Sequence, residues 1–229
     1  MTVNTARYDP GWTFVRTHLP APPARVVEIG CGPDGGFVPA LLRAGHRAVG
    51  VDPAAPEGEH YERIPFERHE RGATVDVIVA STSLHHVGDL GEVLDHAADL
   101  LKPGGTIVVI EFAHELFDEA TARWCFEHLP EPGEQPGWLH GHRAGWAASG
   151  RSWPDYRASW VRAEAMHGGT SILRALDARF SRVQVADRLP YFFPDLAGVE
   201  EADEQAAIDA DRIQGTGFRY VGERRRRHI

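Results

Sequence analysis

The sequence predicts an α/β fold with a doubly wound, mostly parallel sheet and a helical cap inserted into it. Short apolar strand patterns alternate with helical patterns through the first half of the chain, the alternation stops from Phe112 to about Thr170, and it resumes afterwards. Alternation of this kind favours a parallel sheet with helices on both faces. The length of 229 residues allows one domain with an elaboration.

The first half of the chain contains four predicted strands. In order they are 25–29, 48–51, 75–80 and 106–110. A helix over about 5–19, carrying Tyr8 and Trp12, is expected before them. A glycine-rich turn leads from the first strand into the apolar helical run 37–44, and a second run at 89–101 follows helical spacing behind an Asp89/Glu92 capping box.

The segment from about 113 to 170 has a different character. Prolines and glycines interrupt its helical pieces, and it holds five of the six tryptophans of the chain. We interpret it as a helical cap whose indoles either pack as the core of a small subdomain or line a ligand pocket. The rest of the sheet is expected within about 171–222, with helices at 172–179 and about 199–213 and strands at 182–186 and 218–221.

Composition disfavours several classes of protein and partner. Hydrophobic residues make up 42% and charged residues 25% of the chain, which is typical of globular proteins. Asp and Glu outnumber Lys and Arg by 33 to 24, which disfavours nucleic acid or a membrane surface as a partner, because phosphate contacts need clustered cations. The basic run 224–227 is interpreted as a solvated tail.

The chain shows no apolar run as long as a membrane span and no secretory signal, so we expect a cytoplasmic protein. Its two cysteines, Cys31 and Cys125, are too few for a disulfide framework. Neither stands in a Cys-x-x-Cys pair, so structural zinc is not expected either.

The strongest motif lies at the turn after the first strand. Glycines there let a strand turn sharply into a helix and let a ligand approach the backbone. Asp52 stands twenty residues after Gly32, at the end of the next strand, where a carboxylate can accept hydrogen bonds from ribose hydroxyls. We therefore expect a nucleoside-containing cofactor. The spacing Gly30-x-Gly32-x-x-Gly35 also fits the dinucleotide fingerprint, so an NAD(P)-dependent oxidoreductase is an alternative.

Two features disfavour a dinucleotide. Asp34 is expected at the N-terminus of the following helix, where its carboxylate would compete with a pyrophosphate for the backbone N–H groups. Lys102 is the only lysine of the chain, so the Tyr-x-x-x-Lys pair of short-chain dehydrogenases cannot form. A cofactor without phosphate fits better.

The order and spacing of several short motifs resemble those of the class I S-adenosylmethionine-dependent methyltransferases. The matching motifs lie within about 25–112. They are Glu28-x-Gly30-x-Gly32, Asp52, the adenine loop at 64–67, the strand and substrate-facing loop at 76–86, and residues 101–105 before the predicted strand 106–110. The resemblance implies a seven-stranded sheet with the cap after its fifth strand. Asp34 departs from the family pattern, in which many members have a third glycine there, and this puts the local turn in doubt.

The resemblance implies S-adenosylmethionine as the cofactor, with S-adenosylhomocysteine as its product. Glu28 would orient the ammonium, Asp52 would accept from the ribose hydroxyls, and Phe66 with Glu67 would bracket adenine. Ser81 would offer its carbonyl to the ammonium. The full implied set is Glu28, Gly30, Cys31, Gly32, Asp52, Pro53, Phe66, Glu67, Ser81 and Thr82. Ordinary turn and cap chemistry is the alternative for each.

Methyl transfer to a hydroxyl benefits from a base, and histidine is the usual base near neutral pH. His86 and His85, in the loop after the predicted strand 75–80, are the first candidates, and His114, past the predicted strand 106–110, is the next. Packing or solvent exposure is the alternative for each. Glu111 could orient His114 or anchor a substrate cation. The spacing of histidines and acidic residues is irregular, so no metal is expected.

The inserted segment is where folds of this kind vary to choose substrates, and here it is rich in tryptophan, histidine and arginine. We expect a small organic acceptor, as in natural-product biosynthesis, methylated on a hydroxyl, carboxylate or amine, with oxygen favoured. Trp12, Glu111, Trp138 and Tyr191 are the expected acceptor contacts, and core packing is the alternative for the aromatic ones. A non-catalytic S-adenosylmethionine-binding module is a further alternative, and the sequence leaves monomer and homodimer open.

Overall fold

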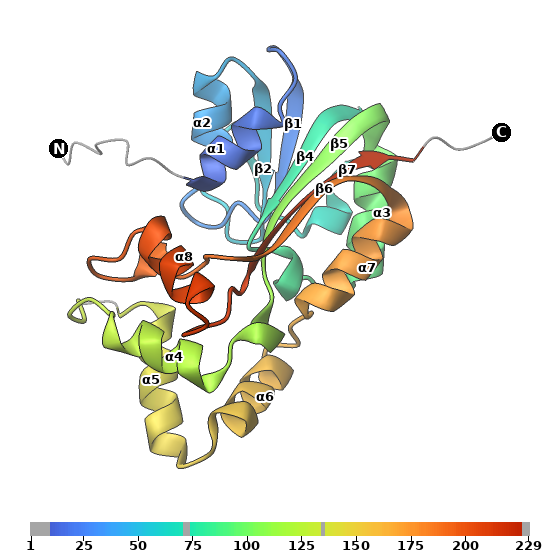
Figure 1. The fold of residues 1–229 in the computed structure, drawn as a ribbon. Coiled ribbons are helices and arrows are strands. Elements are labelled where there is room, and N and C mark those ends of the chain that lie inside the picture. Colours follow the sequence, from blue (N-terminus) through green and yellow to red (C-terminus); the bar gives the residue numbers. More distant parts are fainter. Residues whose placement is uncertain (1–9, 71–73, 134–135, 226–229) are drawn as a thin grey trace. The chain divides into compact units, whose positions relative to one another are not determined.

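A computed structural model describes residues 10–70, 74–133 and 136–225 (Figure 1). The chain divides into two compact units. The sheet unit comprises Met1–Glu111, Ser171–Val185 and Arg219–Ile229, and the cap unit comprises Phe112–Thr170 and Ala186–Phe218. Each unit has its own hydrophobic cluster.

The sheet unit is built on a seven-stranded sheet with the order β3-β2-β1-β4-β5-β7-β6. Its strands are β1 (Arg25–Ile29), β2 (Arg47–Val51), β3 (Tyr61–Glu62), β4 (Val75–Ser81), β5 (Leu101–Phe112), β6 (Phe180–Leu189) and β7 (Gly217–Arg224). The pairs β1/β2, β1/β4, β2/β3 and β4/β5 are parallel. The strand order reverses at β1, and ligands of open α/β sheets bind outside the carboxyl ends of the strands at such a point.

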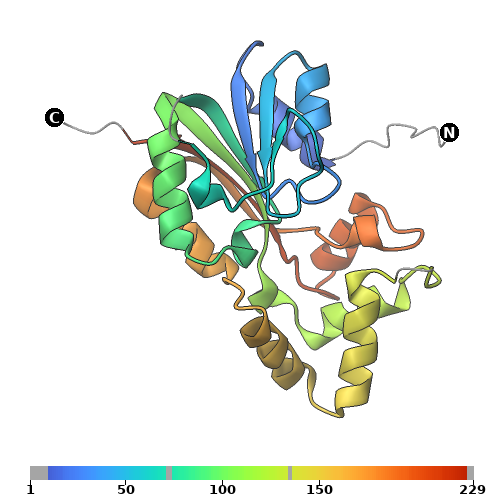
Figure 2. The same cartoon turned by 180° about the vertical axis from the view of Figure 1, so that it is seen from behind.

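Helices cover both faces of the sheet (Figures 1 and 2). α1 (Pro10–Thr17) and α2 (Val38–Arg43) lie on one face, and α3 (Leu90–Leu100) and α7 (Gly169–Arg179) lie on the other. Phe14, Val38 and Leu41 pack in one buried cluster with strand residues of β1, β4 and β5. Because β1 and β4 are covered on both faces, their sequences are almost continuously apolar.

The cap unit contains α4 (Glu119–Glu127), α5 (Trp138–Ser149), α6 (Trp153–Ala163) and α8 (Glu201–Asp209). Its core is largely aromatic. Trp153 is fully buried and donates its Nε1–H to the Phe117 carbonyl at 2.7 Å. Trp160 is also buried, whereas Trp138 is 37% exposed. The cap therefore buries some of its indoles as a core and leaves one at the surface of the unit.

The predicted fold class is confirmed, and several boundaries differ from the expected ones. β5 begins at Leu101 instead of residue 106, because Leu101 pairs with Val75 ahead of a register shift. The two-residue β3 was not predicted, and α8 ends at Asp209 instead of residue 213. In the N-terminal helix expected over 5–19, Pro10–Thr17 is helical, while Tyr8 lies outside the described residues. The cap unit also takes in 186–218, which the sequence placed with the sheet.

Candidate functional site

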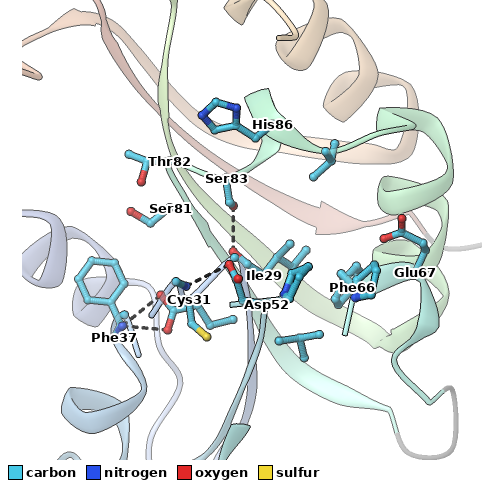
Figure 3. A pocket seen from close by; sticks show the side chains of 18 of the residues that line it. Ile29, Cys31, Phe37, Asp52, Phe66, Glu67, Ser81, Thr82, Ser83 and His86 are labelled. Carbon is cyan, nitrogen blue, oxygen red and sulfur yellow. Dashed lines mark hydrogen bonds between the residues drawn. The ribbon is translucent and has the colours of Figure 1, made fainter. Parts of the chain in front are cut away.

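A cavity of about 730 Å³ lies at the carboxyl ends of β1, β2 and β4 in the sheet unit (Figure 3). This volume is within the range of small-molecule sites. Its wall contains every residue that the resemblance implies for the cofactor, namely Glu28, Gly30, Cys31, Gly32, Asp52, Pro53, Phe66, Glu67, Ser81 and Thr82. The structure thus brings the set together, and the contacts of these residues with the cofactor stay a prediction.

Glu28 is buried and holds the turn between β1 and α2. Both carboxylate oxygens accept from the Phe37 amide, Oε2 at 2.8 Å and Oε1 at 3.1 Å. Burial raises the pKa of Glu28 to about 7, against the lowering effect of hydrogen bonds from the Phe37 and Val38 amides. Gly36 allows the close approach, since its φ is +53° and an added Cβ would lie 2.3 Å from Glu28 Oε1.

Asp34 does not stand where the sequence placed it. α2 begins at Val38, and Asp34 is exposed in the preceding turn, outside the cavity wall. Glu28 fills the role expected of Asp34 at the start of the helix, because its carboxylate accepts from the amide of Phe37, the residue that precedes α2. A protein carboxylate therefore occupies an N–H group that a pyrophosphate would need. A dinucleotide is therefore disfavoured by Glu28, and not by Asp34 as the sequence suggested.

Asp52 follows β2 and joins two turns. Its Oδ2 accepts from the Gly32 amide at 3.1 Å, and its Oδ1 accepts from the Ala54 amide at 2.6 Å. These bonds fix the carboxylate beside the glycine turn, where it lines the cavity. A carboxylate has about four lone-pair sites, so both oxygens can still accept from hydroxyl groups of a ligand.

The end of β4 forms another part of the wall. Ser83 donates its hydroxyl to the Ile29 carbonyl at 2.8 Å, which joins the loop after β4 to the end of β1. Gly30 is required beside it, because its φ is +72° and an added Cβ would lie 2.2 Å from Ser83 Cβ. Thr82 has a φ of +49°, a strained conformation for a β-branched residue and one that is found at ligand sites.

The cavity has two distinct ends. Figure 3 shows Phe66 and Glu67 on the side of Asp52 away from Ser81 and Thr82. Phe66 is buried and packs edge-on against His96, with ring centroids 4.9 Å apart. An elongated ligand can therefore reach from an apolar loop, past a carboxylate, to the turn at the ends of β1 and β4.

The charge of the wall restricts the ligand. Among the described residues that line the cavity, Glu28, Asp52 and Glu67 are acidic, and none is lysine or arginine. Like charges repel in a partly closed site, so this lining disfavours phosphate groups and favours a cationic ligand.

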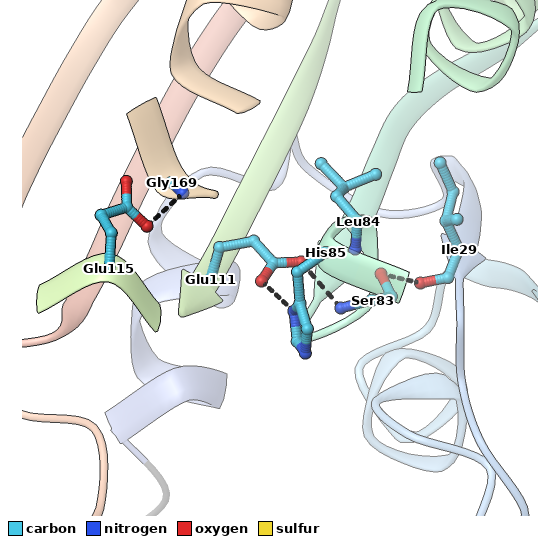
Figure 4. Close-up of polar contacts among 7 residues, drawn as sticks. All are labelled: Ile29, Ser83, Leu84, His85, Glu111, Glu115 and Gly169. Carbon is cyan, nitrogen blue, oxygen red and sulfur yellow. Dashed lines mark hydrogen bonds and ion pairs between the residues drawn. The ribbon is translucent and has the colours of Figure 1, made fainter. Parts of the chain in front are cut away.

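The two histidines after β4 lie in different surroundings. His86 is exposed and lines the cavity, whereas His85 is buried, with its Nδ1 2.6 Å from Glu111 Oε2. Glu111 is fully buried, and its Oε1 accepts from the Ser83 and Leu84 amides at 2.8 and 2.5 Å (Figure 4). Glu111 therefore holds this loop, and its expected roles, orienting His114 or anchoring a substrate cation, stay predictions.

Trp12 and His114 lie in different units. Trp12 is on α1 in the sheet unit, with its ring centroid 6.2 Å from that of Phe37, a residue of the cavity wall. His114 begins the short 3₁₀ segment His114–Leu116 of the cap unit and is 9% exposed. Neither of them lines the cavity.

The cap unit holds an aromatic cluster, which we define as Phe112, Phe117, Trp138, Tyr191 and Phe192. Tyr191 stacks on Phe112, with ring centroids 4.6 Å apart and planes at 13°. Trp138 lies within 6.5 Å of three of the other rings by centroid and donates its Nε1–H to Asp195 at 2.9 Å. The cluster therefore carries both cap residues that were expected to contact the acceptor.

Sequence reasoning missed other cavity residues, among them Phe37, Ser83, Val87 and Gly88. Ser83 had a usable signal, since it follows the end of a buried strand next to residues that were named. Phe37 had none, because it reads as the first apolar residue of a helix.

No group of three or more His, Cys, Asp or Glu side chains in the described part of the chain is arranged to hold a metal ion. No helix within the described ranges is long and apolar enough to cross a membrane. The cytoplasmic location stays a prediction.

Comparison with known proteins agrees with this geometry. The sequence profile of a family described as "Methyltransferase domain" matches residues 13–154. The ubiquinone biosynthesis O-methyltransferase of Nitrobacter winogradskyi is 35% identical over 94 residues, a match that covers 35% of this chain and 36% of that protein. The similarity thus spans about a third of the length of this curated relative.

Two solved structures share the fold over most of the chain. An S-adenosylmethionine-dependent methyltransferase from Mesorhizobium loti has a TM-score of 0.56 at 21% identity, covering 93% of this chain and 97% of that one. The 1,6-didemethyltoxoflavin-N1-methyltransferase of Burkholderia thailandensis, solved with 1,6-didemethyltoxoflavin and S-adenosylhomocysteine, has a TM-score of 0.53 at 16% identity, covering 95% and 77%. At these identities the likeness shows the fold alone.

Proposed function

The chain belongs to the family of class I S-adenosylmethionine-dependent methyltransferases, and from this membership we propose that it methylates a hydroxyl oxygen of a small organic acceptor. S-adenosylmethionine is its cofactor. When bound, the cofactor supplies an electrophilic methyl group on a positively charged sulfur. The specific acceptor, the preference for oxygen and the role of each residue are the proposed parts.

The charge of the cavity wall carries the proposal. Glu28, Asp52 and Glu67 line the cavity, and none of the described lining residues is lysine or arginine. S-adenosylmethionine carries an ammonium and a sulfonium and no phosphate, so it suits this wall, whereas NAD(P) would bring a pyrophosphate against it.

The two ends of the cavity support an orientation for the cofactor. We assign its ammonium to Glu28 and to the carbonyl of Ser81, and its ribose hydroxyls to Asp52. The adenine is assigned to the loop with Phe66 and Glu67. This order follows the separation of Ser81, Asp52 and the Phe66–Glu67 loop along the cavity (Figure 3).

His86 is the proposed base. It is exposed and lines the cavity, while His85 is buried against Glu111 and His114 lies in the cap unit. His86 would take the proton of the acceptor hydroxyl as its oxygen attacks, an effect of about 10² to 10⁴ in rate. The remaining acceleration would come from alignment of the acceptor and exclusion of water.

The aromatic cluster is the proposed contact for the acceptor. Trp138 combines an exposed ring with an indole N–H fixed on Asp195, and Tyr191 is held flat against Phe112. Rigid aromatic faces favour a flat, apolar acceptor frame. We therefore favour an aromatic natural-product intermediate that carries a hydroxyl.

Calorimetry with S-adenosylhomocysteine and with NAD tests the cofactor site. We expect saturable binding of S-adenosylhomocysteine and none of NAD at the same concentrations, and the reverse preference would contradict the assignment.

Incubation with methyl-labelled S-adenosylmethionine and a panel of phenols, hydroxy acids and amines tests the reaction. Products methylated on oxygen are expected, and methylation of amines alone would overturn the proposal. His86→Ala should lower turnover of a hydroxyl acceptor by about 10² to 10⁴, with affinity for S-adenosylhomocysteine within about twofold. His60→Ala, a half-exposed histidine outside the cavity wall, is the matched control and should leave turnover unchanged.

A further inference from the structure

We propose that Glu111 and His85 form a buried positioning pair that keeps a proton on His85 Nδ1 and so holds the loop that carries His86 into the cofactor cavity. The inference deepens the proposed function and rests on it, since it takes the cavity to be the cofactor site and His86 to be the base.

One carboxylate, that of Glu111, makes polar contacts with three consecutive residues of this loop. Glu111 Oε1 accepts from the amides of Ser83 and Leu84, and Oε2 lies 2.6 Å from His85 Nδ1. Figure 4 shows these contacts running from the end of β5 to the short helical turn after β4. Glu111 is fully buried and His85 is 5% exposed. A buried carboxylate is stable only with such donors around it.

The geometry assigns the proton between the two side chains. Because Oε1 already accepts two N–H groups, only Oε2 faces the ring. Two lone pairs cannot approach to 2.6 Å without a shared proton. A carboxylate accepts and an imidazole Nδ1–H donates, so the pair forms a charge-assisted hydrogen bond that fixes the ring.

The pair reaches the cavity through the loop that it fixes. Ser83 gives its amide to Glu111 and its hydroxyl to the Ile29 carbonyl. Ser83, His86, Val87 and Gly88 line the cavity, while Leu84 and His85 are buried behind them. The rings of His85 and His86 lie 4.2 Å apart by centroid. The buried residues Leu84 and His85 therefore fix the loop, and the next residue, His86, places its side chain at the cavity wall.

The cap unit offers a matched control. Glu115 also accepts two backbone amides, those of Gly169 and Thr170, at 2.9 and 2.8 Å. Its bond to Gly169 is drawn in Figure 4. Glu115→Gln removes the charge from a clamp of the same kind in the other unit, so it should leave His85 unaffected.

Nitrogen-15 NMR of the histidine rings in the full chain tests the pair directly. In the wild type we expect His85 Nδ1 to be protonated. In Glu111→Gln the amide oxygen must stay on the Ser83 and Leu84 amides, so its NH₂ group faces Nδ1, and the proton should move to Nε2. Glu115→Gln should keep the wild-type pattern. An unprotonated Nδ1 in the wild type, or an unchanged tautomer in Glu111→Gln, would overturn the proposal.

Calorimetry with S-adenosylhomocysteine tests whether the pair positions the loop. Glu111→Gln and His85→Leu should each weaken binding by about threefold to tenfold, the scale of one lost hydrogen bond. His85→Asn places an amide N–H near the position of Nδ1, so it should restore affinity to within about twofold of the wild type. Equal weakening by His85→Asn and His85→Leu would mean that the ring acts only as packing, and the proposal would fail.

Two controls keep these readings separate. If the wild type does not bind S-adenosylhomocysteine, the proposed function fails while the tautomer result still decides the pair. If circular dichroism shows that Glu111→Gln is unfolded, the wild-type tautomer and the two His85 variants decide it.

Discussion

The cavity of the sheet unit and the aromatic cluster of the cap unit are built in different ways. The cavity wall consists of short stretches that each lie within a few residues of a strand end, with backbone amides fixed by Glu28, Asp52 and Glu111. The aromatic cluster instead joins side chains that are far apart in the sequence, such as Phe112 and Tyr191. The first kind of site depends on local turns, and the second depends on tertiary packing.

The two regions share one device. In the cap unit, Glu204 is fully buried and accepts the amides of Tyr191, Phe192 and Phe193 at 2.8, 3.2 and 2.7 Å. It fixes the backbone that carries two rings of the aromatic cluster, as Glu28 fixes the turn before α2. A buried carboxylate therefore fixes backbone amides in both units. In the sheet unit the fixed backbone forms turns at the cavity wall, and in the cap unit it carries aromatic side chains.

The largest expected effect tests whether the cap is needed for the cavity. Trp153→Ala should destabilise the cap unit by about 3 to 5 kcal/mol, because it leaves a large cavity in a buried aromatic core. Urea unfolding followed by far-ultraviolet circular dichroism measures the loss. Affinity of the folded variant for S-adenosylhomocysteine should stay within about twofold.

Trp146→Ala is the control for that measurement. Trp146 also donates its indole N–H to a carbonyl, that of Arg151 at 2.9 Å, but it is only partly buried. Its loss should be about 1 to 2 kcal/mol, since less apolar surface is exposed. A folded Trp153→Ala protein without cofactor affinity would show that the cavity depends on the cap, against the comparison above.

The next effect tests the carboxylates of the cavity. Asp52→Ala should weaken S-adenosylmethionine binding by about 1.5 to 3 kcal/mol, the range for hydrogen bonds to a charged acceptor. Calorimetry gives the change, with circular dichroism to show that the fold is intact. Asp34→Ala, an exposed carboxylate in the adjacent turn and outside the cavity wall, should change affinity by less than about twofold. Equal effects of both variants would remove Asp52 from the site.

Sequence reasoning succeeded where structure follows from local rules. The apolar strands, the glycine turn and Asp52 are each recognisable within a few residues, so the sheet could be predicted and the ten residues named for the cofactor line one cavity. It failed where the outcome depends on distant partners. Nothing near Glu111 indicates that its carboxylate contacts Ser83, Leu84 and His85, and the start of α2 four residues beyond Asp34 depends on Glu28.

A smaller expected effect is the pH dependence of S-adenosylhomocysteine binding, which tests the charge of Glu28. Burial raises its pKa from 4.5 to about 7, and its ionised form is the one that attracts an ammonium. Binding below pH 7 therefore requires loss of a proton, so affinity for S-adenosylhomocysteine should rise by about tenfold from pH 6 to pH 8. Glu28→Gln should flatten this profile. For folding the sign is opposite, since the raised pKa stabilises the protein at low pH and this contribution is lost as the pH rises through 7. The same pH slope in Glu28→Gln would exclude Glu28 as its source.

The smallest effect concerns the exposed ring of the cap. Trp138→Ala should raise the KM of an aromatic acceptor by about fivefold, which is the roughly 1 kcal/mol of one aromatic contact, and should leave affinity for S-adenosylhomocysteine unchanged. Trp124→Ala is a fitting control, because Trp124 lies on α4 outside the aromatic cluster, with its ring centroid 4.7 Å from that of His128. Steady-state kinetics with an acceptor from the panel, together with calorimetry, separates the two sites. A higher KM in Trp138→Ala alone supports a contact between Trp138 and the acceptor. Such a contact site forms only when side chains that are distant in the sequence pack together. Equal changes in both variants would mean that the tryptophans of the cap serve stability, and that the acceptor is chosen elsewhere.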